Sequence, residues 1–135
     1  MKLPLLIFCA SLAFAGQTDW QKRLQEANGL DHEGRYGEAQ EIYVAALAEA
    51  ESSGDAGARL AQTLNNLAAH HFLCGNYAQT EPLYRRALEA WKTAGQEFAH
   101  DLALTMKNLG SLYRTLGRYA EAEPLYAAAL PMLER

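Results

Sequence analysis

Cysteine, proline and clustered positive charge are all scarce in this chain of 135 residues. It has two cysteines and four prolines, and its formal net charge is −4. No run of basic residues exceeds Arg85-Arg86, whereas proteins that bind DNA or RNA need a basic stripe to neutralise phosphates. We therefore expect no nucleic-acid partner. Sustained alternation of polar and apolar residues is also lacking, so we expect no β-sheet.

The amino-terminal segment differs in composition from the rest. Lys2 precedes an uncharged run over residues 3–18, and a small-x-small tripeptide stands at residues 13–15. This pattern predicts a signal peptide over residues 1–15, cleaved near Ala15, and hence a periplasmic or secreted protein. The alternative is an uncleaved anchor, but a transmembrane helix needs about 20 apolar residues. After cleavage we expect no membrane span.

Removal of the signal peptide would leave Cys74 as the one remaining cysteine. A single thiol excludes an internal disulfide. Packing alone must then stabilise the mature chain.

Two stretches of the chain are near-copies. Residues 60–88 and 102–130 lie 42 positions apart, and 14 of their 29 aligned residues are identical. A weaker third copy begins upstream, where residues 34–39 correspond to residues 117–122. Self-similarity at such a period indicates stacked repeats, because one unit cannot bury its apolar face alone.

Each repeat has the pattern of a helical hairpin. Apolar residues recur three and four positions apart, and Gly34, Gly75 and Gly117 stand where the first helix of each hairpin should end. We therefore predict an all-α fold, with repeats at about 18–52, 58–94 and 100–135 in a single domain over residues 16–135.

Small and aromatic residues recur at fixed places in these hairpins. Small side chains allow two helices to cross closely, and a tyrosine one turn further along would fill the wedge between them. The small residues are Ala27, Ala68 and Gly110 in the first helices and Ala39, Thr80 and Ala122 in the second; the tyrosines are Tyr43, Tyr84 and Tyr126.

These residues resemble the tetratricopeptide repeat, and more narrowly its 42-residue kinesin-light-chain-type variant. The resemblance rests on Leu-Asn-Asn-Leu-Ala at residues 64–68, Gly-Arg-Tyr-Ala-Glu-Ala-Glu-Pro-Leu-Tyr at 117–126, and His-Asp-Leu-Ala-Leu-Thr at 100–105. It implies an α-solenoid, a right-handed superhelix of about three antiparallel helix pairs. In this family the first helices line a concave groove that binds an extended peptide or a partner helix.

Nine residues match the groove positions of the family. Asparagine amides suit a peptide backbone because they both donate and accept hydrogen bonds, and cations would hold an acidic group. The alternative is that these side chains are merely solvated. The predicted groove residues are Gln25, Asn28, Asn65, Asn66, Ala69, Lys107, Asn108, Ser111 and Arg114.

The second repeat departs from the third at two positions. His70 and His71 stand where the third repeat has Leu112 and Tyr113, and His70 lies four residues before Cys74, on the same helix face. Two ligands are too few for a closed zinc site, and the sequence shows no third group to orient a Cys–His nucleophile. We therefore predict no metal, cofactor or catalytic residue, and we interpret His71 as a core substitute for tyrosine.

The sequence thus predicts a non-enzymatic scaffold for protein–protein interaction. One alternative is a regulatory or targeting segment of an enzyme system, encoded nearby or within a longer chain. Another is a thiol- or metal-dependent sensor using Cys74 and His70. The apolar Leu125, Leu130 and Leu133 near the end of the chain would also allow docking of a second copy or continuation of the repeat array.

Overall fold

The computed structural model describes residues 19–54 and 57–134; the predicted signal peptide lies outside them. Within these ranges every regular element is helical. The elements are a first helix over residues 19–32, α2 (Tyr36–Ser52), α3 (Ala58–Leu73), α4 (Tyr77–Ala94), the 3-10 helix η1 (Gln96–Phe98), α5 (Ala99–Thr115) and α6 (Tyr119–Leu133).

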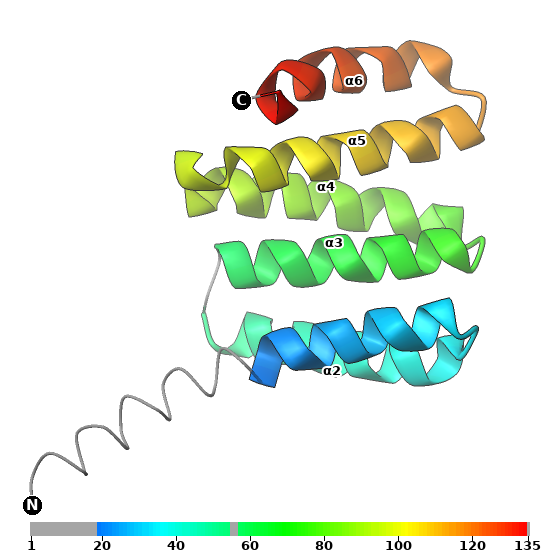
Figure 1. The fold of residues 1–135 in the computed structure, drawn as a ribbon, viewed down its shortest axis with the longest axis vertical. Coiled ribbons are helices and arrows are strands. Elements are labelled where there is room, and N and C mark those ends of the chain that lie inside the picture. Colours follow the sequence, from blue (N-terminus) through cyan, green and yellow to red (C-terminus); the bar gives the residue numbers. More distant parts are fainter. Residues whose placement is uncertain (1–18, 55–56, 135) are drawn as a thin grey trace, which may run out of the picture.

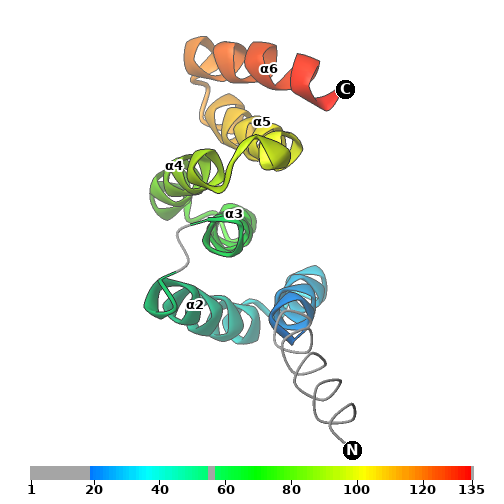
Figure 2. The same ribbon diagram turned by 90° about the vertical axis from the view of Figure 1, so that its left-hand side faces the viewer.

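The helices form three antiparallel pairs that stack along the long axis of the molecule (Figure 1). Repeat 1 is the first helix with α2, repeat 2 is α3 with α4, and repeat 3 is α5 with α6. Viewed nearly along the helices, α2 and α4 lie on one side of the stack, and the first helix, α3 and α5 lie on the other (Figure 2). The prediction of an all-α solenoid of helix pairs is confirmed.

The turn inside each repeat is closed by a glycine in the left-handed conformation. Gly34, Gly75 and Gly117 have φ angles of 78°, 77° and 76°. In each case the next residue donates its N–H to the carbonyl five residues earlier, over 2.8 Å. Because only glycine adopts this conformation without steric strain, the three predicted hairpin turns are explained by their glycines.

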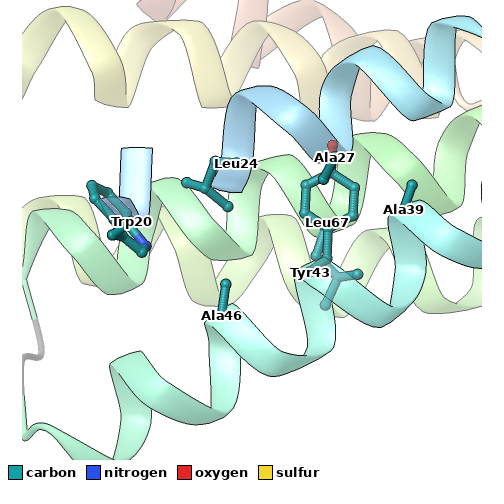
Figure 3. Close-up of a cluster of buried hydrophobic side chains, with 7 residues drawn as sticks. All are labelled: Trp20, Leu24, Ala27, Ala39, Tyr43, Ala46 and Leu67. Atoms are coloured by element: carbon teal, nitrogen blue, oxygen red, sulfur yellow. The ribbon is translucent and has the colours of Figure 1, made fainter. Parts of the chain in front are cut away.

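Repeat 1 buries its apolar face within the hairpin and against repeat 2 (Figure 3). Tyr43 of α2 is fully buried, and Leu67 of α3 completes the cluster from the neighbouring repeat. Repeat 1 therefore depends on repeat 2 for part of its core, as expected for a solenoid. The cluster contains Trp20, Leu24, Ala27, Ala39, Tyr43, Ala46 and Leu67.

Small residues permit the close helix crossings, as the sequence predicted. Ala27, Ala68 and Ala39 are fully buried. Gly110 of α5 faces the ring of Tyr126 on α6, and a Cβ atom at Gly110 would lie 3.1 Å from the nearest ring carbon. The two helices therefore cross here more closely than a residue with a Cβ atom would ordinarily allow.

Replacing Gly110 with leucine is expected to lower the free energy of unfolding by about 1–3 kcal/mol, because the larger side chain must displace the Tyr126 ring. Urea denaturation followed by circular dichroism measures this change. Gly29→Leu is the matched control, since Gly29 is also helical but a Cβ atom added there would meet no neighbouring side chain or helix within 4 Å. Equal effects of both substitutions would contradict the overpacking argument.

A buried tryptophan joins each repeat to the next. The indole Nε1 of Trp20 donates to Thr63 Oγ1 over 3.2 Å, between repeats 1 and 2. Trp91 Nε1 donates to Thr105 Oγ1 over 3.0 Å, between repeats 2 and 3. The two tryptophans come from different helices of the hairpin, so the sequence repeat does not predict this shared junction.

Helix α6 leaves part of its apolar face open. Leu130 is 51% exposed, while Leu125 and Leu133 are half-buried. Docking of a second copy on this face stays a prediction, as do the division into domains and the exact repeat limits. In the described part of the chain, no helix is both long and apolar enough to cross a membrane.

Candidate binding groove

The nine predicted groove residues come from the first helix of each repeat. Gln25 and Asn28 lie on the first helix, three residues lie on α3, and four lie on α5. The contacts of α3 with α5 place two of these sets side by side. Their role in ligand binding stays a prediction. Gln25, Asn28, Lys107 and Arg114 are exposed, and Asn65, Asn66, Ala69, Asn108 and Ser111 are half-buried.

The side chain of Asn65 is already engaged within the protein. Its Oδ1 accepts hydrogen bonds from Thr105 Oγ1 over 3.0 Å and from Asn108 Nδ2 over 3.1 Å. Its Nδ2 donates to Asn66 Oδ1 over 3.3 Å. Asn65 therefore links α3 to α5 and fixes the amides of Asn66 and Asn108. This linking role was missed in the sequence, because the three partners lie up to 43 residues apart.

Two other groove residues bind the wedge tyrosines. Asn28 Oδ1 accepts the hydroxyl of Tyr43, and the Ser111 hydroxyl lies 3.0 Å from that of Tyr126. Ala69 occupies the same register in repeat 2 and offers no such group to Tyr84. Hence the polar residue at this position links the two helices of the hairpin in repeats 1 and 3.

Replacing Tyr43 with phenylalanine is expected to lower the free energy of unfolding by about 0.5–1.5 kcal/mol, because the hydroxyl loses its hydrogen bond to Asn28 and its interaction with Asp31. Tyr84→Phe is the matched control at the equivalent position, where Ala69 supplies no acceptor, and should change stability less. Thermal and urea denaturation measure both variants. A larger loss for Tyr84→Phe would show that the polar contacts of the Tyr43 hydroxyl contribute little.

The cations of α5 differ from most others in being unpaired. Among the described residues, neither Lys107 nor Arg114 has a carboxylate within ion-pair distance, and Arg114 is the one arginine of which this is true. Both side chains are exposed, and their spacing of seven residues places them on one face of α5. The face of α5 that bears these two residues thus carries positive charge that the described part of the protein does not neutralise.

Comparison with known proteins agrees with this architecture. The sequence pattern of the tetratricopeptide repeat family matches residues 59–135. The chain belongs to the tetratricopeptide repeat family. Such repeats generally mediate protein–protein interaction. A search of the curated proteins found no significant match.

A solved tetratricopeptide-like stack has a similar fold. BtubC (BKLC) from P. vanneervenii superposes with a TM-score of 0.76 and is 24% identical in sequence. The match covers 84% of this chain and 46% of BtubC, so this chain spans less than half the length of that protein. At this level of identity the likeness shows the fold alone.

In the second tetratricopeptide repeat, His71 takes the place of the tyrosine found in the third. It is 8% exposed, as predicted for a core residue, and its Nδ1 lies 3.5 Å from Asn76 Nδ2 in the hairpin turn. Burial and the neighbouring His70 lower the pKa of His71. His71 is therefore best described as part of the core of this repeat.

His70 has the polar partner that the sequence did not reveal. Its Nδ1 lies 2.7 Å from Asp31 Oδ1, and its Nε2 lies 3.8 Å from Cys74 Sγ. Asp31 and His70 are 6% and 1% exposed. The expectation that no third group orients the Cys–His pair is therefore wrong. The signal that could have revealed this partner was the histidine itself. His70 occupies the position that corresponds to the buried Leu112 of repeat 3, and a buried imidazole requires a polar partner.

The same geometry bears on metal binding. His70 uses different ring nitrogens toward Asp31 and Cys74, so these three residues cannot all bind one ion. In the ranges that the structure describes, no group of three metal-ligating side chains is assembled. The cluster is thus a linear arrangement of a carboxylate, an imidazole and a thiol.

Proposed function

We propose that this chain is a non-enzymatic scaffold that holds an extended, acidic peptide or partner segment along the first helices of its repeats. The observation that carries the proposal is that Lys107 and Arg114, seven residues apart and so on one face of α5, are both exposed and have no carboxylate partner among the described residues. Tetratricopeptide repeats commonly act through such interactions.

The two kinds of group have different roles in this proposal. The Asn65 hydrogen bonds hold the amides of Asn66 and Asn108 in place before a ligand arrives, which reduces the entropy lost on binding. Those amides pair with a peptide backbone irrespective of its side chains. Lys107 and Arg114 favour a carboxylate and so set the preference for acidic sequences.

Fluorescence anisotropy with three labelled, otherwise identical peptides tests this function. The peptides carry two glutamates, two lysines or two serines at the same positions. We expect the glutamate peptide to bind most tightly and its affinity to fall with added salt. The double variant Lys107→Ala/Arg114→Ala should weaken that binding about fivefold to tenfold, since an exposed ion pair contributes about 0.2–1 kcal/mol.

The double variant Arg86→Ala/Lys92→Ala is the control. It removes the same total charge from residues that are paired with Glu51 and Glu89 and that do not belong to the groove. Equal weakening by both double variants would show that only the net charge matters. Equal affinity for the three peptides, or binding of none, would contradict the proposed function.

We also propose that the protein acts after export, on the basis of the signal-like pattern of residues 1–15. Amino-terminal sequencing of the chain expressed in a Gram-negative host should find a periplasmic product that begins near Gly16. A product that keeps Met1 and stays with the membrane fraction would instead indicate an anchor.

A further inference from the structure

Three reactive side chains are connected in a line at the junction of repeats 1 and 2. Asp31 comes from the end of the first helix, His70 from α3, and Cys74 from the residue that follows α3. The imidazole lies between the other two, 2.7 Å from the carboxylate and 3.8 Å from the sulfur. This is the order of nucleophile, base and orienting carboxylate found in enzymes with an activated nucleophile.

The hydrogen-bonding partners define how the imidazole is oriented. A carboxylate only accepts hydrogen bonds, so Nδ1 of His70 carries the proton that it donates to Asp31. In the neutral ring Nε2 then presents its lone pair to Cys74, and the thiol S–H donates to it. The base is therefore already directed at the sulfur.

Packing fixes this orientation at the imidazole, while the cysteine is less buried. The centroid of the His70 ring lies 5.4 Å from the ring centroid of Tyr43, 5.3 Å from that of His71 and 6.4 Å from that of Tyr36. These neighbours enclose the imidazole, whose side chain is 0% exposed. Cys74, by contrast, is only half-buried.

The resting form of Cys74 is the protonated thiol. Burial and the negative charge of Asp31 raise the pKa of Cys74, and the carboxyl end of a helix further disfavours an anion. A thiol of this kind reacts only when its proton is removed, but its thiolate is then strongly nucleophilic, because nucleophilicity rises with thiol pKa. Nε2 of His70 is placed to take that proton.

We propose that Cys74 is a thiol–disulfide exchange site for small-molecule disulfides, with His70 as the base and Asp31 as the residue that positions it. The Cys74 proton moves to Nε2, and the sulfur attacks one sulfur of the disulfide R–S–S–R. The S–S bond breaks, Cys74–S–S–R forms, and the leaving thiolate takes the proton from His70. Cys74 is oxidised and half of the disulfide is reduced to R–SH. This activity goes beyond peptide binding and does not depend on the groove.

The test uses the full chain with Cys9→Ser, so that Cys74 is the one thiol. Oxidised glutathione and 5,5′-dithiobis(2-nitrobenzoic acid) serve as disulfides; intact mass identifies the adduct, and absorbance gives the rate. His70→Gln should slow the reaction at pH 7 by about tenfold or more, since a positioned base commonly contributes 10²–10⁴-fold. The control is His100→Gln, which changes an exposed histidine at the start of α5 in repeat 3, and it should react within about twofold of the parent chain, a small change beside that contribution.

The pH profile separates a base from a merely structural histidine. With His70 as the base, the reactive form of the parent chain is the pair of thiolate and imidazolium, which forms when one proton moves from Cys74 to His70. No proton enters or leaves the pair in this step, so the amount of the reactive form does not change with pH while the neutral pair predominates. The rate in the parent chain should therefore level off through neutral pH. In His70→Gln the rate should rise about tenfold per pH unit up to the thiol pKa, as for an isolated thiol. Circular dichroism establishes that the variants are folded.

Three outcomes would overturn the proposal. They are the absence of an adduct on Cys74, a rate in folded His70→Gln within about twofold of the parent, or a parent profile with a single tenfold slope per pH unit. The last measurement needs no variant, so the proposal remains testable if His70→Gln does not fold. Peptide binding is measured separately, and failure of either activity leaves the other standing.

Discussion

Replacement of His70 with leucine is expected to lower the free energy of unfolding by about 3–5 kcal/mol, because it removes the imidazole partner of the buried Asp31 carboxylate and leaves only the nearby Tyr43 hydroxyl to interact with it. Leucine itself is suitable in this position, since the equivalent Leu112 of repeat 3 is fully buried. The loss would therefore come from the carboxylate and not from shape. Urea denaturation with circular dichroism at constant pH measures it.

The double variant Asp31→Leu/His70→Leu is the control that identifies the cause. Replacing both members of a buried polar pair by apolar residues is often neutral or stabilising, so much of the lost stability should return. If the double variant is instead as unstable as the sum of the two single variants, the Asp31–His70 contact does not account for the effect.

A second large effect is expected at Trp91. Replacement with alanine should lower the free energy of unfolding by about 3–5 kcal/mol, because the indole is 4% exposed, packs with Ala61 and Ala90, and lies 5.6 Å from the Phe98 ring. Trp91→Phe keeps most of the packing and loses the bond to Thr105, so it should lose less stability. Chemical denaturation of both variants measures the difference.

The position of Trp91 also predicts where the damage appears. Each repeat of a solenoid contacts only its neighbours, and Trp91 joins α4 to α5. Hydrogen exchange should therefore accelerate most in α5 and α6 and least in the first helix. Uniform acceleration throughout the chain would contradict this and indicate that the three repeats unfold as one cooperative unit.

Local steric requirements made much of the fold predictable. Gly34, Gly75 and Gly117 have positive φ angles, and such angles are strained for other residues, so the glycines identify the turns without knowledge of the rest. The recurrence of small residues at Ala27, Ala68 and Gly110 likewise located the close crossings. Each of these signals is repeated in the sequence, and the repetition makes it recognisable.

The polar contacts between repeats could not be predicted in the same way. Asp31 binds His70 across 39 positions of sequence, and Asn108 binds Asn65 across 43. Neither pair recurs at the other junction, because the partner residues differ from repeat to repeat. Which side chains meet depends on how neighbouring hairpins are rotated against each other, and that angle is set by packing rather than by a local pattern.

The two tryptophans of the chain are each placed at a different junction, Trp20 at the first and Trp91 at the second. Each junction accordingly carries its own intrinsic fluorophore, hydrogen-bonded to a threonine and shielded from solvent. With one indole changed to phenylalanine, the emission wavelength of the other would report when its own pair of repeats separates. Tryptophan fluorescence would thus show the order in which the two junctions between repeats open during unfolding.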